Sequence, residues 1–362
     1  MKICFFLSDI TKIGGIERVT ATLAPLLNGF NDLDVSIVSM FKGRSSPNYK
    51  MPSNIPIKFL TNEQHGLRPH SFKRAMGMLL NISVVRNYFK NSIYDYIIAQ
   101  SFPIALILFL SGYPAHKIIA VEHVYAGYYG TILQYIRKYI YSKFSKIIVL
   151  TNADKLFFEK YLPSNLICVI PNPVRKINSM INSTLEKKEI ISVGRLEYQK
   201  GYDNLILGFK DINKKYPDWK LNIYGDGSLR YQLQTKINNL GLNKVITLCG
   251  HTNDIDSKLN KASIYVMSSI FEGFGMVLVE AMSHGVPCVA YDCPNGPADI
   301  IANGINGYLV EDQNIQALNQ ALEELIKNPA ERKRLGSNAP KSILKFSAEI
   351  VAHKWHDMLK SL

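Results

Sequence analysis

Paired cysteines, long apolar runs and the common nucleotide-binding fingerprints are all missing from this chain of 362 residues. Its five cysteines are scattered and none forms a C-x-x-C pair, which argues against a disulfide framework or a zinc site and favours a reducing compartment. The most apolar later run, residues 104–112, falls far short of the ~20 residues that span a bilayer. The N-terminal run lacks a cleavage site and predicts a buried strand. We therefore expect a cytoplasmic protein without a transmembrane segment.

Acidic residues are scarce in the first half of the chain. The formal net charge is +13, and residues 1–172 hold 19 Lys and Arg against 9 Asp and Glu. This asymmetry favours nucleic acid, an anionic membrane surface or a phosphorylated substrate, without choosing among them. Residues 68–90 and 128–146 mix cations with aromatic and large aliphatic side chains, as interfacial membrane helices do. The alternative is two amphipathic helices with an apolar face in the core and a solvated basic face. No recognised nucleic-acid motif accompanies the charge.

Short apolar segments alternate with helical or glycine-rich stretches in both halves, which predicts parallel sheets with helices on both faces. The predicted strands are KICFFLS, DVSIVSM, YDYIIAQS, KIIAVEH and KIIVL, then EIISVGR, WKLNIYGDG, KVITLCG, SIYVMSS, VPCVAY and GYLV. Pro171 and Pro173 interrupt the pattern. We place one domain at residues 1–172, a second at 173–345 and a terminal amphipathic helix at 346–362. The apolar residues of this helix are Ile350, Val351, Trp355 and Leu359. Ligands of such domains bind at the carboxyl ends of the strands.

Two strand-to-helix loops carry features that suit an anion, although neither G-x-G-x-x-G nor the P-loop pattern is present. In SDITKIGGIERV, Gly14 and Gly15 allow close backbone approach, and the helix start that follows offers N–H groups. In SVGRLEYQKGYDNLI, Arg195 and Lys200 follow a strand and match the charge of a diphosphate.

A third loop, in SSIFEGFGMVLVEAMSHG, holds two glutamates. Glu272 precedes the predicted helix, the amides of residues 273–276 lie at its start, and Glu280 lies about a turn inside it. The spacing alone leaves open an acid–base pair, a metal site or two carboxylates that hold a ligand.

In this order and spacing the motifs resemble glycosyltransferase family 4, whose members have the GT-B fold. The matching segments are GGIERV, EH at residues 122–123, IPNPV, VGRLEYQKG, YGDGSLR and FEGFGMVLVEAMSHGVPCVAYDCPNGPADII, and they span nearly the whole chain. The resemblance implies two Rossmann-like doubly wound domains facing across a cleft. The N-terminal one would be on the acceptor side, the C-terminal one would bind the nucleotide sugar, and the terminal helix would return to the first.

The resemblance also implies site residues and their roles. Arg195 and Lys200 would bind the donor diphosphate, and Glu280 would bind the ribose. Glu272, with the amides of Gly273, Phe274 and Gly275, would bind the donor sugar. Gly15 would lie near the phosphate or sugar, and His123 would lie near the transferred sugar and the acceptor. The candidate catalytic residues are His123, Glu272, Arg195 and Lys200. Family members retain anomeric configuration by front-face attack, so Glu272 is not assigned as a nucleophile. No metal or other cofactor is expected. Gly296, in a turn lining the cleft, would allow close approach.

The family resemblance implies a UDP-sugar donor and a glycan or glycolipid acceptor, lipid-diphosphate-linked, in bacterial O-antigen, capsule, lipopolysaccharide or other surface-polysaccharide synthesis. We expect a peripheral protein on the inner face of the cytoplasmic membrane, with an anionic membrane surface and no nucleic acid as a partner. Two other functions stay open: a sugar-nucleotide epimerase of the same architecture, and a non-catalytic polyanion-binding protein. The transferred sugar, a hexose or N-acetylhexosamine, is not defined by the sequence.

Overall fold

The computed structural model describes residues 1–62, 77–174 and 183–362. The chain forms two compact units, one of Met1–Arg175 with Phe346–Leu362 and one of Lys176–Lys345. The sequence analysis divided the chain after residue 172 and began the terminal helix at residue 346. Among the described residues, no helix combines the length and the apolarity needed to cross a bilayer.

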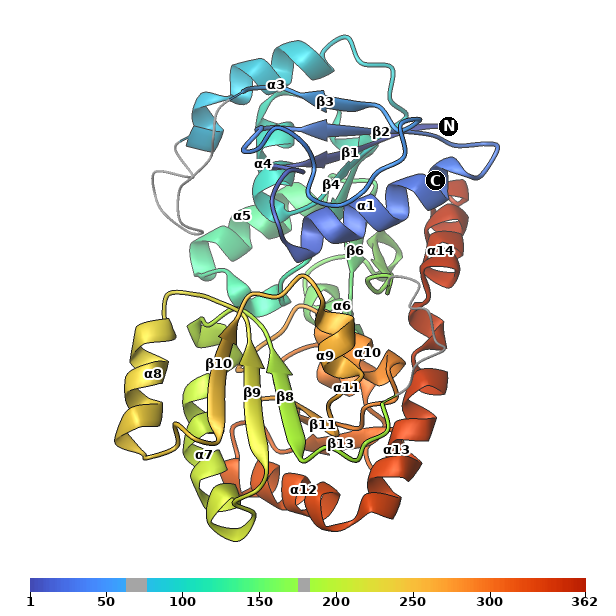
Figure 1. The fold of residues 1–362 in the computed structure, drawn as a ribbon. Coiled ribbons are helices and arrows are strands. Elements are labelled where there is room, and N and C mark those ends of the chain that lie inside the picture. The colour runs from blue at the N-terminus through green and yellow to red at the C-terminus, as the bar shows by residue number, and fades with distance from the viewer. Residues whose placement is uncertain (63–76, 175–182) are drawn as a thin grey trace. The chain divides into compact units, whose positions relative to one another are not determined.

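A seven-stranded parallel sheet forms the centre of the first unit (Figure 1), with strand order β3-β2-β1-β4-β5-β6-β7. Its strands are β1 (Lys2–Leu7), β2 (Asp34–Ser39), β3 (Ile57–Phe59), β4 (Tyr96–Ala99), β5 (Ile118–Val121), β6 (Lys146–Val149) and β7 (Ile167–Val169). Most are runs of buried Ile, Val, Phe and Ala, as expected for parallel strands covered on both faces. The sequence analysis missed β3 and β7, which have three residues each.

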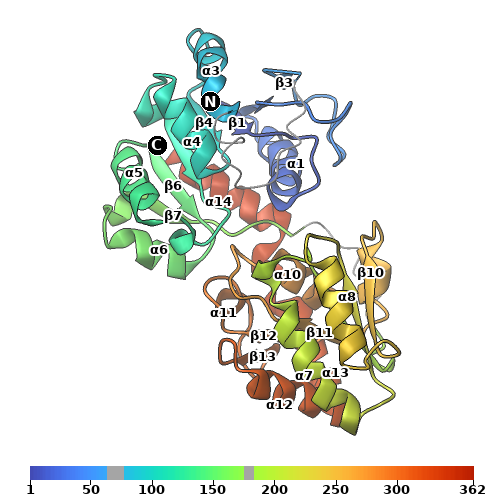
Figure 2. The same ribbon diagram turned by 90° about the vertical axis from the view of Figure 1, so that its left-hand side faces the viewer.

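Helices cover both faces of this sheet. They are α1 (Gly15–Asn28), α3 (Ile82–Phe89), α4 (Phe102–Leu110), α5 (Thr131–Tyr141), α6 (Asn152–Glu159) and α14 (Ala348–Lys360), with short 3-10 turns at Ala115–Lys117, Ala126–Tyr128 and Ser164–Leu166. A further 3-10 turn, Leu344–Phe346, spans the boundary between the two units in the sequence. Successive side chains of a strand point to opposite faces. Cys4 and Phe6 join the core cluster that contains residues of α3 to α6, whereas Phe5 meets Trp355 of α14, with ring centroids 6.4 Å apart. Figure 2 shows α3, α4 and α5 following one another along one side of the unit.

The C-terminal helix α14 packs against α1, which confirms its predicted return to the N-terminal domain (Figures 1 and 2). The imidazole of His356 lies with Nε2 2.8 and 3.0 Å from the two carboxylate oxygens of Asp32 and stacks on Phe30 at 4.0 Å. Trp355 is buried, whereas Ile350, which the sequence analysis also placed on the apolar stripe, is exposed. The helix is therefore held by one apolar face and by a polar contact near its end.

The second unit contains a six-stranded parallel sheet of order β10-β9-β8-β11-β12-β13, and all six predicted strands are confirmed. They are β8 (Glu189–Val193), β9 (Lys220–Tyr224), β10 (Ile246–Gly250), β11 (Ile264–Met267), β12 (Cys288–Tyr291) and β13 (Gly307–Val310). The helices are α7 (Tyr202–Lys215), α8 (Arg230–Asn239), α9 (Ile255–Leu259), α10 (Met276–Ser283), α11 (Pro297–Ile300), α12 (Ile315–Lys327) and α13 (Pro329–Ser342), with a 3-10 turn at Tyr198–Lys200. Because all strands are parallel, their carboxyl ends share one edge of the sheet.

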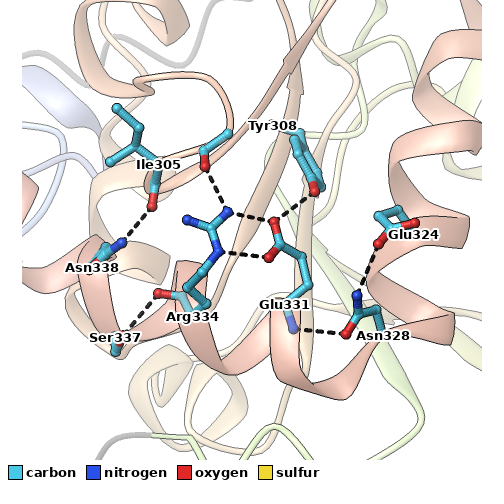
Figure 3. A network of polar contacts seen from close by, with 9 residues as sticks. Ile305, Tyr308, Glu324, Asn328, Glu331, Arg334, Ser337 and Asn338 are labelled. Carbon is cyan, nitrogen blue, oxygen red and sulfur yellow. Dashed lines mark hydrogen bonds and ion pairs between the residues drawn. The ribbon is translucent and has the colours of Figure 1, made fainter.

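A polar network joins α13 to the segment before β13 (Figure 3). Arg334 forms two hydrogen bonds with Glu331, at 2.7 and 2.6 Å, and donates a third to the carbonyl of Gly304 at 2.8 Å. The hydroxyl of Tyr308 also donates to Glu331, at 2.9 Å, and Asn328 caps the helix by accepting from the Glu331 amide. Arg334 holds the pKa of Glu331 below its usual value. The network fixes the chain between α11 and β13 on the helix.

The packing of α14 leads to a stability prediction. Trp355→Ala removes a buried ring that contacts β1, and we expect it to lower the free energy of unfolding by about 3–5 kcal/mol. Ile350→Ala on the same helix is the matched control and should change it by less than about 0.5 kcal/mol, because that side chain is exposed. Urea unfolding followed by far-UV circular dichroism measures both, and equal effects would contradict the observed packing of α14.

Candidate active site

Two loops at the carboxyl edge of the second sheet meet in an ion pair. Lys200 follows β8 and Glu272 follows β11, and their Nζ and Oε1 atoms are 2.5 Å apart. Both side chains are mostly buried, so each charge needs the other to offset lost hydration. The sequence analysis gave Lys200 to the diphosphate and Glu272 to the sugar, and the structure brings the two side chains into direct contact.

Further contacts hold Glu272 in place. The buried hydroxyl of Ser269 donates a hydrogen bond to Oε1 of Glu272 at 2.6 Å. The backbone amide of Glu272 donates to the carbonyl of Pro294 at 3.1 Å. Gln199 donates to the carbonyl of Phe271 at 3.0 Å and so joins the same two loops. The sequence analysis missed Ser269, although a hydroxyl pair directly after a strand was a usable signal.

Glycine at position 201 allows these loops to approach each other. Gly201 has a φ of 60°, the left-handed region that side chains disfavour, and begins α7. A Cβ there would overlap the carbonyl oxygen of Ser268, whose own hydroxyl donates to the Lys200 carbonyl at 2.9 Å. Any larger residue would separate the loop of Lys200 from the loop of Glu272.

Arg195 is the exposed cation of this edge. Its side chain forms no hydrogen bond or ion pair with the part of the chain that the structure describes, whereas its neighbour Leu196 is fully buried and anchors the loop. A guanidinium held on an anchored loop can donate two parallel hydrogen bonds to an oxyanion. In residues 1–62, 77–174 and 183–362, no group of three or more His, Cys, Asp or Glu has the arrangement of a metal site.

The start of α10 lies in the same loop as Glu272. Gly275 caps the helix with a φ of 93°, and Gly273 and Phe274 precede it. The Phe274 side chain is buried, so only its backbone can serve a ligand at the position that the sequence analysis assigned to it. Glu280 is also buried, in the second turn of α10. Its assignment to the ribose stays a prediction.

Gly296 allows a close approach to a neighbouring loop of the protein. It has a φ of 96°, and a Cβ there would overlap the backbone carbonyl of Phe274. The glycine therefore lets the turn after β12 lie against the loop that contains Phe274. Together with the bond from Glu272 to Pro294, it makes the turn after β12 a support for the Glu272 loop.

Gly15 lies in the first unit, at the first turn of α1. A Cβ at this position would meet no atom within 4 Å, and the residue that caps the helix is Gly14, which has no side chain. The preceding loop is fixed by buried Asp9, which accepts hydrogen bonds from the Thr11 amide and hydroxyl and from the Gly43 amide at 2.6–3.1 Å. The loop is rigid while the space beside Gly15 is open.

His123 is the second residue after β5 and contacts Gln100, which directly follows β4. Its Nε2 lies 2.9 Å from the Oε1 of buried Gln100, and burial lowers the pKa of the imidazole to about 4. At neutral pH the ring therefore carries one proton, which Nε2 donates to Gln100, and Nδ1 is left as an acceptor. The sequence analysis found His123 and missed Gln100.

Glu122 anchors the chain next to His123. Its carboxylate accepts a hydrogen bond from Tyr141, and Arg137 Nε lies 3.7 Å from Oε1. All three side chains are buried, and burial raises the pKa of Glu122 although Arg137 and Tyr141 oppose that shift. Because Arg137 and Tyr141 belong to α5, the pair ties this helix to the end of β5.

Comparison with known proteins finds a glycosyltransferase match in the second half of the chain. Residues 175–342, slightly less than half of the chain, match the model described as glycosyl transferases group 1. Over these residues the chain is similar to this family of glycosyltransferases. Three curated relatives extend the similarity over the whole chain. An uncharacterized glycosyltransferase of Haemophilus influenzae is 29% identical over 99% of both chains. The amylovoran biosynthesis glycosyltransferase of Erwinia amylovora is 27% identical over 99% of both.

The third relative is the GalNAc-α-(1→4)-GalNAc-α-(1→3)-diNAcBac-PP-undecaprenol α-1,4-N-acetyl-D-galactosaminyltransferase of Campylobacter jejuni, which is 26% identical over 98% of this chain and 97% of its own. Among solved structures, S. aureus TarM in a complex that includes UDP superposes with a TM-score of 0.80 at 20% identity over 99% of both chains. Anabaena HepE with UDP-glucose gives a TM-score of 0.75 at 20% identity over all of both chains. These likenesses confirm the GT-B fold of the glycosyltransferase.

The environment of His123 leads to a titration prediction. Its imidazole should titrate near pH 4, well below the usual 6.5, because the protonated ring would be buried. NMR of the isotope-labelled ring measures this, with His123→Gln assigning its signal among the eight histidines. The unfolded chain binds this proton at a higher pH than the folded chain does, so this group lowers stability as the pH falls from 6.5 towards 4. A midpoint near 6.5 would contradict the described burial.

Proposed function

We propose that this glycosyltransferase moves a hexose or N-acetylhexosamine from a UDP-sugar to a lipid-linked glycan with retention of configuration, in bacterial surface-polysaccharide synthesis on the cytoplasmic face of the membrane. The observation that carries the proposal is the pairing of Lys200 with Glu272 at the carboxyl edge of the second sheet, where Arg195 is exposed. Cations for a diphosphate and a carboxylate for sugar hydroxyls then lie side by side.

The similar proteins support the donor and the acceptor class. TarM and HepE were solved with UDP and with UDP-glucose, respectively, and the name of the Campylobacter jejuni relative includes a PP-undecaprenol glycan. The name of the Erwinia amylovora relative refers to amylovoran biosynthesis. Galactose, glucose and their N-acetylated amines are all compatible with one carboxylate at Glu272, so the proposal leaves the sugar unspecified.

The proposed chemistry needs charge stabilisation more than covalent help from the protein. The bond between the anomeric carbon and the diphosphate oxygen breaks, and an acceptor hydroxyl bonds to the same face of that carbon. The acceptor proton passes to the leaving diphosphate, which departs as UDP. Arg195 and Lys200 would stabilise the growing negative charge of this leaving group. The acceptor atom Nδ1 of neutral His123 would accept a hydrogen bond from a sugar hydroxyl.

A donor screen tests the reaction class. With no acceptor present, the protein should hydrolyse a UDP-sugar slowly, and UDP should raise its thermal unfolding midpoint more than GDP does. Chromatography of the products measures the hydrolysis, and thermal unfolding measures the binding. A preference for GDP-sugars would overturn the donor assignment, and rapid conversion to an epimeric nucleotide sugar would replace the transferase with an epimerase.

Charge removal tests the diphosphate assignment. Lys200→Met and Arg195→Ala should each lower kcat/KM for donor hydrolysis by about 10- to 100-fold, because each removes a charge-assisted hydrogen bond of about 1.5–3 kcal/mol. Lys236→Met is the matched control, because Lys236 pairs with Asp203 at 3.0 Å in the same unit without being a predicted site residue. Losses below threefold for both Lys200→Met and Arg195→Ala would contradict the assignment.

A further inference from the structure

Helix α5 leaves most of its apolar residues outside. Its buried positions are Arg137, which pairs with Glu122, and Ile140 and Tyr141 at its C-terminal end. The outward positions are Ile132, Tyr135, Ile136 and Tyr139, with Leu133 beside them. Ile132 is 78% exposed, Tyr135 69% and Tyr139 61%. Positions 132, 135, 136 and 139 have the spacing of one helical stripe, which here faces away from the core.

This concentration of exposed apolar side chains is local. The five on α5 lie within a helix of eleven residues, about 16 Å long. In the described part of the second unit the exposed large apolar residues are also five, but they fall on separate segments: Tyr198, Leu207, Tyr231, Ile305 and Leu344. Contiguous exposed apolar surface usually marks an interaction site, whereas scattered residues need no explanation.

The charge around the stripe has one sign. Residues 123–153 contain no Asp or Glu and four Lys or Arg. Exposed Lys138 and Lys143 flank the stripe, with Lys138 Nζ 5.4 Å from the Tyr161 ring and Lys143 Nζ 4.7 Å from the Tyr139 ring. On the next helix, Glu159 pairs with Lys155 at 3.7 Å. Apolar and tyrosine side chains edged by lysines match an interface of acyl chains, headgroups and anionic phosphates.

We propose that the outer face of α5 docks the enzyme on an anionic lipid surface. A second copy of the chain fits this face less well, because a two-fold contact through α5 would set Lys138 and Lys143 against their own copies without a carboxylate of that segment to pair with. The inference rests on the proposed function, because docking would bring the enzyme to a lipid-linked acceptor in that surface. Its test needs no sugar transfer.

Vesicle co-sedimentation of the full chain tests the surface, with neutral phosphatidylcholine vesicles compared with vesicles that also contain phosphatidylglycerol. The wild type should bind the anionic vesicles more strongly, and added salt should weaken this binding. The double variant Ile132→Ser/Tyr135→Ser should lower the partition coefficient by about tenfold or more, and Lys138→Gln/Lys143→Gln should remove most of the preference for anionic vesicles.

Matched controls lie in the second unit. Leu207→Ser/Tyr231→Ser removes two exposed apolar side chains, and Lys210→Gln/Lys333→Gln removes two exposed cations. Both should bind vesicles as the wild type does. Binding by the α5 variants equal to that of the controls would overturn the proposal. A lipid-free dimer that the α5 variants dissociate, without any change in vesicle binding, would assign the face to a second copy instead.

Donor hydrolysis, measured without lipid, separates this inference from the proposed function. All four double variants should keep the wild-type rate, because none of the substituted residues lies among the predicted site residues. A protein that binds anionic vesicles through α5 but hydrolyses no nucleotide sugar would refute the proposed function and leave the docking surface standing. If the protein hydrolyses the donor and the α5 substitutions leave vesicle binding unchanged, the docking surface is refuted and the proposed function stands.

Discussion

The ion pair between Lys200 and Glu272 is the interaction on which the candidate active site depends. A mostly buried carboxylate is costly unless a cation and hydrogen bonds compensate it, so these two loops are stable only together. Because Glu272 also bonds Ser269 and the carbonyl of Pro294, the pair fixes the positions of three loops at the carboxyl edge of one sheet. Arg195, on the loop of Lys200, takes no part in these contacts and is exposed.

The same requirement organises the first unit around Glu122. Arg137 and Tyr141 compensate this buried carboxylate, and both come from α5. The next residue, His123, is held by Gln100, so a structural ion pair and a proposed substrate contact are adjacent in the chain. The same face of α5 is buried through Arg137, Ile140 and Tyr141, so Ile132 and its neighbours on the stripe face outward.

Local patterns predicted the parts of the fold whose causes are local. Apolar runs identified every strand of the second sheet. The strand β3 escaped because its three residues, Ile57, Lys58 and Phe59, are too short a run to define an alternating pattern. Gln100 and the contact of Lys200 with Glu272 escaped for another reason: they join residues 23 and 72 positions apart, which no spacing rule connects. Gly296 was found, but its true neighbour, the Phe274 backbone, was not.

The two basic aromatic stretches show where composition stops being informative. Part of residues 68–90 lies outside the described residues, and the described part includes α3, which buries Val85 and Phe89. Residues 128–146 include α5, whose apolar stripe is as regular as that of a core helix. The sequence alone could not say which face is buried, because both faces of α5 contain large side chains. Tertiary contacts decide the assignment: Arg137 lies near Glu122 and donates to the carbonyl of Ala126, Ile140 and Tyr141 are buried on the same helix, and the remaining apolar side chains meet the solvent.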